Sequence, residues 1–228
     1  LYVERFLVRA RHLEVQIVGD GASVSHLWDR ECSLQRQRQK VIEIAPADTL
    51  PMAVRERLFG YGVALGQAAG YRSLGTMEFL VDGDDVVFIE GNARLQVEHT
   101  VTEEVTGLDI VAAQLRIADG ASLADLGLAG RPPAPRGAAI QARVNLETMG
   151  PDASPLPQGG VLTAYDPPDG PGVRVDGFGY AGGVLFLTGM VIMAWNVTMT
   201  MLAGKAQDAP IPDVAGAHAA GRTALPQR

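Results

Sequence analysis

The sequence contains little of what disulfide-bonded, secreted or nucleic-acid-binding proteins require. Its 228 residues include one cysteine, Cys32, which excludes a disulfide framework and is typical of a reducing compartment. The formal net charge is −7 and no basic patch is concentrated anywhere, so we expect no nucleic-acid partner. No charged segment followed by an apolar one opens the chain, so we expect no secretory signal and a cytoplasmic location.

Length and composition indicate a soluble globular protein that can build a real core. Apolar residues make up 47% of the chain and charged residues 20%, the usual balance of such proteins. The first residue is leucine rather than methionine, so we expect this N-terminus to be a partial one.

The stretch from Glu78 to His99 carries the most chemical information. Runs of β-branched and aromatic residues at 77–81 and 86–89 flank acidic and glycine turn residues, which predicts a β-hairpin. If the turn centres near Asp84, antiparallel pairing follows from the alternation of side chains. The expected partners are Val81 with Val87, Leu80 with Phe88, and Glu78 with Glu90.

The opposed pair Glu78 and Glu90 predicts a cation site. Carboxylates facing each other with Cβ atoms ~4.5–5.5 Å apart repel, and a cation between them resolves the conflict. Oxygen ligands suit Mg²⁺ or Mn²⁺, and Asn92 supplies a third. In an extended chain the residues on the same side are Glu90, Asn92, Arg94, Gln96 and Glu98.

Two interpretations of this polar side stay open on spacing alone. One is a half-buried strand with a solvated polar face. The other is a site for a metal-complexed phosphate and a small anion, and the combination of acids, amides and an arginine favours it over the Thr, Lys and Ser typical of solvated strands.

Strand patterns precede the hairpin. Strands are expected at 2–7, 12–18, 23–28 and 41–46. The segment 30–40 is too rich in Gln and Arg for us to expect core residues there. If it is extended, Arg36, Arg38 and Lys40 fall on one side and form a basic face suited to phosphates; the alternative is a solvated run of charge.

Helix signals surround the hairpin. Pro51 begins a helix that ends at Gly70, with an apolar stripe of Val54, Leu58, Tyr61, Leu65 and Ala68. Three glycines within it indicate close packing against a sheet. Thr100 or Thr102 is expected to cap a short helix, and Asp109 a second helix over 110–118.

The C-terminal part predicts a smaller β-rich unit and an unusual tail. Residues 126–137, rich in Pro and Gly, indicate a linker, and strands are expected at 138–145, 161–165 and 173–176. Residues 183–204 form an uncharged run about long enough to span a bilayer. The alternatives are a membrane span, a buried segment, or a junction where the reading frame is disrupted, and we favour the last. Residues 205–228 are expected to be disordered.

One motif carries a specific resemblance. The run Glu90-x-Asn92-x-Arg94-Leu-Gln96-Val-Glu98-His99, continued by residues 100–107, resembles the signature of biotin carboxylases, members of the ATP-grasp superfamily. The resemblance covers residues 2–182. It implies an α+β fold, with an ATP-grasp portion at 1–125, an antiparallel sheet flanked by helices, and part of the β-rich biotin carboxylase C-terminal domain at 126–182.

The resemblance implies an activity. Such enzymes use ATP and bicarbonate to make carboxyphosphate and then carboxylate biotin held on a carrier protein, with Mg²⁺ or Mn²⁺. The expected partners are a biotin carboxyl carrier protein and a carboxyltransferase, and a homodimer is a further expectation. No Ala-Met-Lys-Met biotin-attachment sequence occurs here, so we expect the carrier elsewhere. The final carboxyl acceptor is set by the carboxyltransferase.

The resemblance also implies roles for individual residues. Metal ligands are expected at Glu78, Glu90 and Asn92. The bicarbonate and biotin chemistry is expected at Lys40, Arg94, Gln96, the Val97 backbone, the base Glu98 and Arg143. Nucleotide contacts are expected at Glu4, Leu7, His12, Gln35, Arg38 and Leu80.

The chain departs from the family at several points. Arg38 stands where His is common, and Gly91 where a larger apolar residue is usual. The family's N-terminal domain, its Gly-rich lid and two ATP-binding lysines precede the point where this chain begins, so we expect no normal turnover from it alone. Two alternatives are a ligase of carbamoyl-phosphate-synthase type, which the run from Gln96 to His99 disfavours, and an inactive carboxylase fragment.

Overall fold

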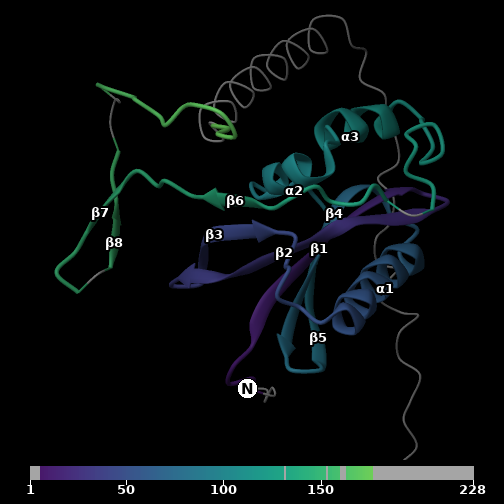
Figure 1. The fold of residues 1–228 in the computed structure, drawn as a ribbon, viewed down its shortest axis with the longest axis horizontal. Helices are drawn as coiled ribbons and strands as arrows, with labels where there is room; N and C mark the ends of the chain where they lie inside the picture. The colour runs from purple at the N-terminus through teal and green to yellow at the C-terminus, as the bar shows by residue number, and fades with distance from the viewer. Residues whose placement is uncertain (1–5, 131, 153, 160–162, 177–228) are drawn as a thin grey trace, which may run out of the picture. The chain divides into compact units, whose positions relative to one another are not determined.

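The computed structural model describes residues 6–130, 132–152, 154–159 and 163–176 (Figure 1). The chain divides into two compact units, residues 1–163 and 164–228. Within the second unit the described residues 164–176 contain no helix or strand, and Arg174 and Asp176 make an ion pair at 2.9 Å between Nε and Oδ2.

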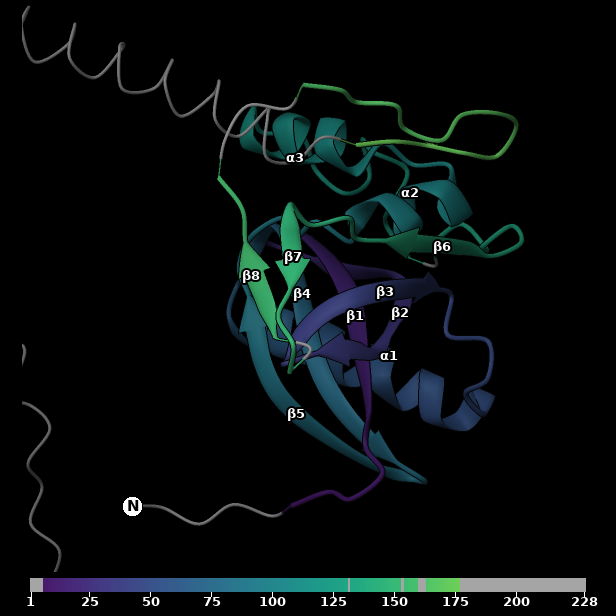
Figure 2. The ribbon, with the colours of Figure 1, turned by 90° about the vertical axis from the view of Figure 1, so that its left-hand side faces the viewer.

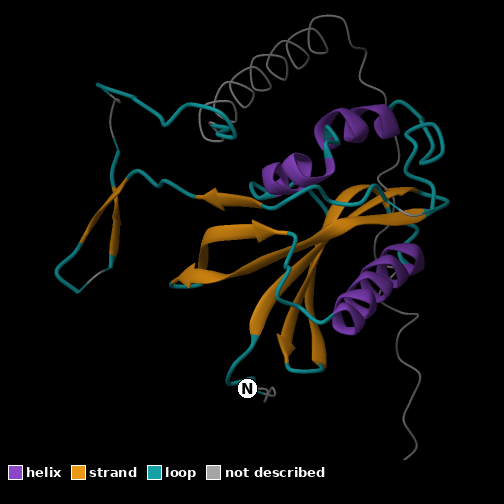
Figure 3. Ribbon diagram, viewed as in Figure 1, coloured by secondary structure: helices purple, strands orange, loops and turns teal. Residues whose placement is uncertain are grey.

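The first unit contains the helices and strands shown in Figure 3. In chain order they are β1 (Arg11–Asp20), β2 (Val24–Arg36), β3 (Gln39–Ala45), α1 (Met52–Ala68), β4 (Arg72–Asp82), β5 (Asp85–Asn92), α2 (His99–Thr106), α3 (Ile110–Ala118), β6 (Ala139–Ala142), β7 (Glu147–Met149) and β8 (Pro155–Pro157). A six-stranded antiparallel sheet has the order β5-β4-β1-β2-β3-β6, and β7 pairs with β8. The expected α+β fold is confirmed.

The two faces of the sheet have different coverings. Helix α1 lies on one side and helices α2 and α3 on the other, as Figures 1 and 2 both show. On the α1 side, Leu13, Val15 and Ile17 of β1 pack with Val54 and Leu58. Because side chains alternate along a strand, the even residues of β1 point toward α2 and α3. The α2 side therefore receives the polar residues of the central strand.

A second apolar cluster closes the α3 end of that face. Leu27 and Leu74 pack there with Ile110 and Ile117. A third, smaller cluster packs Val101 of α2 against Ala45 of β3. The predicted helix over 110–118 is confirmed with its cap, since the Asp109 side chain accepts a hydrogen bond from the Ala112 N–H at 2.7 Å.

Close packing of α1 depends on glycine. A Cβ at Gly66 would lie 2.9 Å from Cγ1 of Val24, and one at Gly62 would lie 3.1 Å from Cγ1 of Val15. The predicted helix and its close approach to a sheet are confirmed. The predicted stripe is partly wrong, because Tyr61 and Leu65 are 48% and 36% exposed. The side of α1 that carries Gly62 and Gly66 faces the sheet, in place of the predicted side with Tyr61 and Leu65.

The central hairpin forms with a different register near its turn. Gly83 and Asp84 make a two-residue turn, with φ +61° at Gly83. Phe79 therefore pairs with Phe88, Leu80 with Val87, and Val81 with Val86, one residue away from the predicted pairing. A β-bulge then shifts the register, so that Glu78 does pair with Glu90.

The segment 30–40 is a second hairpin rather than one extended polar run. Strand β2 continues to Arg36, and the turn at Gln37 and Arg38 has positive φ values of 50° and 68°. The predicted basic face is therefore wrong. Arg36 pairs with Gln39 and Lys40 pairs with Gln35, so Arg36 and Lys40 point to opposite faces of the sheet, and Arg38 lies in the turn between their strands. The expectation that this segment builds no core is also wrong, because Arg30 and Cys32 are 0% exposed.

Several smaller expectations need correction. Helix α2 begins after Glu98, so Thr100 and Thr102 lie inside it rather than capping it. Strands β7 and β8 were not expected, whereas residues 163–165 and 173–176, where strands were expected, contain none. Phe6 and Leu7 are not in a strand, and residues 2–5 lie outside the described residues.

The predicted domain limits remain predictions. The first compact unit continues past residue 125, because β6 pairs with β3. The expectations for 183–204 and 205–228 fall outside the described residues. Within the part of the chain that the structure describes, no helix has the length and apolar character to cross a membrane.

The glycines of α1 give a matched pair for mutation. At Gly60 no atom lies within 4 Å of the position that a Cβ would take, so Gly60→Ala should raise the free energy of unfolding by ~0.5–1 kcal/mol through helix propensity. Gly66→Ala should lower it by about 1 kcal/mol, because stiff Val24 and Ile17 must shift. Urea denaturation followed by circular dichroism measures both; a stabilising Gly66→Ala would contradict the packing.

Candidate active site

An ammonium group held by three carboxylates lies on the α2 side of the sheet. Lys40 of β3 donates to Oε1 of Glu14 on β1, to Oε1 of Glu78 on β4 at 3.1 Å, and to Oε1 of Glu98 at 2.7 Å. All three glutamates are at most 5% exposed. We call Glu14, Lys40, Glu78 and Glu98 the acidic cluster. Charges this deeply buried are stable only when they are paired in this way.

Glu98 is held on both of its oxygens. Lys40 contacts Oε1, and Nη2 of Arg143, the residue after β6, donates to Oε2 at 2.8 Å. Burial raises the pKa of Glu98, but the charges of Arg30 and Lys40 and the hydrogen bond from Lys40 outweigh it and lower that pKa. Glu98 is therefore ionised at neutral pH and positioned as an oriented carboxylate.

Arg143 bridges Glu98 to a second buried acid. Its Nε lies 2.8 Å from Oε1 of Glu43 on β3, an ion pair whose angle is outside that of a hydrogen bond. Burial raises the pKa of Glu43, and the charge of Arg143 opposes the rise. One arginine thus joins two carboxylates from β3 and from the start of α2.

Glu78 accepts hydrogen bonds from several protein donors at once. Its Oε1 accepts from Asn92 Nδ2 at 2.7 Å and from Gln96 Nε2 at 3.0 Å, besides Lys40. Its Oε2 lies 2.7 Å from His12 Nε2. Burial raises the pKa, but the hydrogen bonds from His12 and Gln96 and the charge of Lys40 lower it to about 2.

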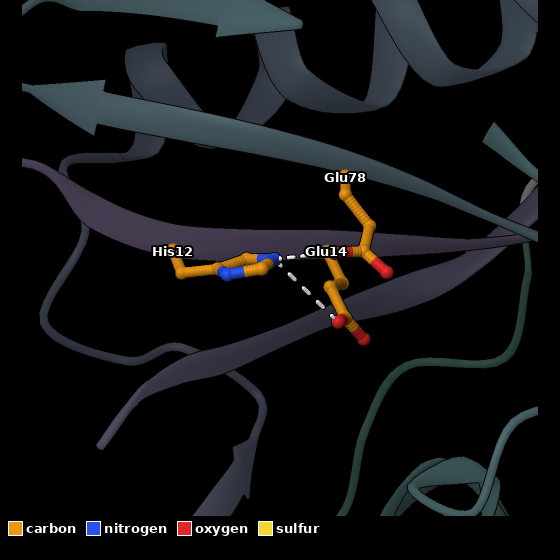
Figure 4. A group of neighbouring side chains, drawn as sticks. All are labelled: His12, Glu14 and Glu78. Carbon is orange, nitrogen blue, oxygen red and sulfur yellow. Dashed lines mark ion pairs between the residues drawn. The ribbon is translucent and has the colours of Figure 1, made fainter. Parts of the chain in front are cut away.

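His12 joins the acidic cluster from the β1 side, as Figure 4 shows. Its Nε2 also lies 3.7 Å from Oε1 of Glu14, and one possible metal-ligand atom from each of His12, Glu14 and Glu78 falls within 4.8 Å of the others. Gln35 holds the opposite ring nitrogen, with its Nε2 2.8 Å from His12 Nδ1, and also donates to the Cys32 carbonyl at 2.9 Å. The ring orientation is therefore fixed at both nitrogens.

The site has the oxygen donors and the charge balance for a divalent cation. Asn92 Nδ2 reaches Glu90 Oε1 at 3.1 Å as well as Glu78, so these three side chains share one small volume. A half-turn of the Asn92 amide would direct its oxygen there and would give the all-oxygen set that Mg²⁺ or Mn²⁺ prefers. Five carboxylates surround the site, Glu14, Glu43, Glu78, Glu90 and Glu98, against three permanent cations, Arg30, Lys40 and Arg143.

Other residues expected at the site are placed less centrally. Arg94 is exposed, and its Nη1 donates to the Leu95 carbonyl at 3.3 Å rather than to the acidic cluster. Arg38 is exposed in the β2–β3 turn. Leu80 is half-buried opposite His12, Val97 is half-buried, Leu7 is half-buried outside any strand, and Glu4 lies outside the described residues. The roles of all these residues stay predictions.

Three charged residues of the site were not expected from the sequence. Glu14 follows His12 by two residues on the same strand, so the alternation of β1 was a usable signal for it. Glu43 lies on β3 three residues after Lys40, a separation that strict alternation places on opposite faces; only the irregular pairing of β3 with β2 brings them to the same face. Arg30 gave no signal, because a run of polar residues does not show which of them is buried.

Comparison with known proteins identifies the family. Residues 1–126 match the family described as the carbamoyl-phosphate synthase L chain, ATP binding domain. The chain belongs to this family. It is also 50% identical over 188 residues to the pyruvate carboxylase of Aspergillus niger, a match that covers 81% of this chain and 16% of the relative. The chain thus spans about a sixth of the length of the curated relatives it matches.

Solved structures give the same result. A single-chain, multi-domain long-chain acyl-CoA carboxylase matches with a TM-score of 0.70 and 51% identity, over 74% of this chain and 18% of that one. The biotin carboxylase domain of a single-chain bacterial carboxylase matches with a TM-score of 0.65 and 51% identity, over 75% of this chain and 38% of that one. The resemblance to biotin carboxylases is confirmed.

The lowered pKa of Glu78 predicts a pH dependence of stability. A carboxyl whose pKa falls from about 4.5 to about 2 on folding contributes stability above pH 4.5 and loses it as the pH falls toward 2. Between about pH 5 and about pH 3 the wild-type chain should lose about 2 kcal/mol of unfolding free energy more than Glu78→Gln does.

Urea denaturation in metal-free buffer at several pH values measures this difference. Glu56→Gln, at an exposed position of α1, is the matched control and should keep the wild-type slope. If Glu78→Gln follows the wild-type pH dependence, then Glu78 is not the stabilised carboxylate that the structure describes.

Proposed function

We propose that this chain contributes to an active site that carboxylates biotin on a carrier protein, using ATP and bicarbonate. The observation that supports it most directly is the arrangement of Lys40, Glu98 and Arg143, in which one oriented carboxylate has a cation at each oxygen. Such an arrangement binds a small anion beside a base. The carboxylase names of the relatives agree with this activity.

In this proposal Glu98 is the base that takes the proton of bicarbonate, while Lys40 and Gln96 hold the anion. Gln96 is 5% exposed and its Oε1 has no hydrogen-bond partner among the described residues, so a half-turn of the amide would aim its N–H groups at the anion and leave the single bicarbonate proton to Glu98. The lowered pKa of Glu98 makes it a weak base, so we expect the dehydrated, cation-rich site to drive the transfer. Deprotonated bicarbonate then attacks the γ-phosphorus of ATP, the bond from that phosphorus to the β-phosphate oxygen breaks, and carboxyphosphate and ADP are formed.

Arg143 is assigned to the second half of the reaction. Negative charge develops on the ureido oxygen of biotin when its nitrogen loses its proton, before that nitrogen attacks the carboxyl carbon, and a guanidinium stabilises such an oxyanion. Arg143 is only partly buried, with 19% of its side chain exposed, so biotin can reach it. Arg94 and the Val97 backbone are proposed as further bicarbonate contacts.

The proposed metal ligands are Glu78, Glu90 and Asn92, which would hold Mg²⁺ or Mn²⁺ on the ATP phosphates. The metal would neutralise phosphate charge, which together with positioning is most of what phosphoryl transfer requires. The nucleotide itself is assigned to Glu4, Leu7, His12, Gln35, Arg38 and Leu80.

The assembly around this site is also a proposal. A biotin carboxyl carrier and a carboxyltransferase are the expected partners, in a homodimer and in the cytoplasm. A ligase of carbamoyl-phosphate-synthase type is the second candidate, because the matching family carries that name. The position of Gln96 and Glu98 in the site favours biotin carboxylation, since the resemblance of the synthases ends at the arginine of the motif.

Nucleotide binding tests the proposed site. Calorimetric titration of the chain with Mn²⁺ and ATP together should give binding that disappears when the metal is omitted. Glu90→Gln should weaken it at least about tenfold, because it removes an anionic ligand from the metal.

Asp84→Asn is the control, because it removes one carboxylate from the turn at the other end of the same hairpin. It should bind as the wild-type chain does. No metal-dependent binding by a folded sample, or an equal loss in both variants, would refute the proposed nucleotide and metal site.

A further inference from the structure

Arg30 of β2 is the largest fully buried side chain of the described residues, with 0% exposure. It makes five hydrogen bonds, and none of its partners belongs to its own strand. Nε and Nη2 donate to Glu14 Oε2 at 3.2 and 3.0 Å, Nη1 to Gln16 Oε1 at 2.8 Å and to Thr102 Oγ1 at 3.0 Å, and Nη2 to Thr76 Oγ1 at 3.2 Å. These partners lie on β1, β4 and α2.

Each of the two carboxylate oxygens of Glu14 contacts a different cation, Arg30 at Oε2 and Lys40 at Oε1. Arg30 takes Oε2 with two N–H groups, so the carboxylate plane is fixed. The other oxygen, Oε1, then faces Lys40. Lys40 in turn reaches Glu78 and Glu98. A chain of fixed contacts therefore runs from a buried arginine to the ammonium at the centre of the site.

We propose that Arg30 is a positioning residue, which fixes Glu14 so that Glu14 holds the Lys40 ammonium between Glu78 and Glu98. The importance of these Lys40 contacts for catalysis rests on the proposed function. Arg30 donates no hydrogen bond to Lys40 or Glu98, so it orients Lys40 through Glu14, separately from the charge that it exerts on Glu98.

The chemistry of arginine explains why this position needs a guanidinium. Its planar fork serves Glu14, Gln16, Thr76 and Thr102 together, and it stays charged when buried. A lysine at position 30 keeps the charge but has one nitrogen, which cannot bind four side chains in different directions. The substitution Arg30→Lys therefore separates geometry from charge.

The chain contains only two lysines, Lys40 and Lys205, and Arg30→Lys or Arg55→Lys adds one more, so the label is assigned to residue 40 itself by fragment sequencing. A short pulse of an N-hydroxysuccinimide acetate, read by mass spectrometry, gives the Lys40 labelling rate, with Lys205 as the reference for reagent dose. An ammonium held by three carboxylates must break those contacts before its nitrogen can attack the reagent. Arg30→Lys should raise the Lys40 rate by about tenfold, the factor for loss of one hydrogen bond to a charged group.

A double-mutant cycle tests the route through Glu14. Glu14→Gln should raise the Lys40 labelling rate by itself, because it removes one of the three carboxylates. In the Glu14→Gln chain, adding Arg30→Lys should produce no further increase, since the group through which Arg30 acts is gone. A further tenfold increase in that background would overturn the proposal.

Arg55→Lys controls for general loosening of the fold. Arg55 is 6% exposed and binds the buried Asp29 of β2 through Nε at 2.9 Å. Asp29 is next to Arg30 in sequence, but Arg55 belongs to α1, on the side of the sheet opposite α2 and the acidic cluster. The substitution should destabilise the chain in urea yet leave Lys40 labelling unchanged. Equal increases in Arg30→Lys and Arg55→Lys, or no change in a folded Arg30→Lys chain, would overturn the positioning role.

This experiment uses no nucleotide, metal, bicarbonate or biotin. Its outcome therefore does not depend on the calorimetric test of the proposed function. If the chain binds no nucleotide in the calorimetric test but shows the expected labelling pattern, the proposed function is refuted. The positioning of Lys40 by Arg30 through Glu14 is still supported in that case.

Discussion

Compensation of buried negative charge is the constraint on which this structure depends. Glu14, Glu78 and Glu98 are nearly inaccessible to solvent, and an uncompensated buried carboxylate would protonate or unfold the site. Lys40 contacts all three, which is possible only because β1, β3, β4 and the start of α2 meet at one place. The strand order of the sheet, with β1 between β4 and β2, is what brings those elements together.

The apolar half of the fold offsets the cost of that polar face. Helix α1 packs closely on one side of the sheet because Gly62 and Gly66 have no Cβ, and the odd residues of β1 fill that core. Strand alternation then sends His12, Glu14 and Gln16 to the opposite side. The same strand thus supplies the largest core cluster on one face and the acids of the site on the other.

In this chain, local sequence patterns predict the positions of helices and strands better than they predict which residues pair across strands. Asp109 and the apolar period after it are sufficient to define α3, because a capped helix is a local structure. The pairing of Glu78 with Glu90 was expected, but the predicted register was wrong near the turn, where the two-residue turn shifts the pairing by one residue. A β-bulge next to Glu78 shifts the pairing back, so that Glu78 lies opposite Glu90. Arg30 could not be found, since its partners Gln16 and Thr102 lie 14 and 72 residues away in the chain.

Shared use of one oxygen links the cation chemistry of the site to its anion chemistry. Glu78 Oε1 accepts hydrogen bonds from Asn92, Gln96 and Lys40 at once. It therefore joins a proposed metal ligand, Asn92, to two proposed bicarbonate contacts, Gln96 and Lys40. In the proposed function a divalent cation held by Glu78 would draw this carboxylate away from Lys40. The two positive charges would also repel, so the ammonium would interact more favourably with a bound anion than with Glu78. Binding of the divalent cation with ATP would in this way favour binding of bicarbonate beside Glu98.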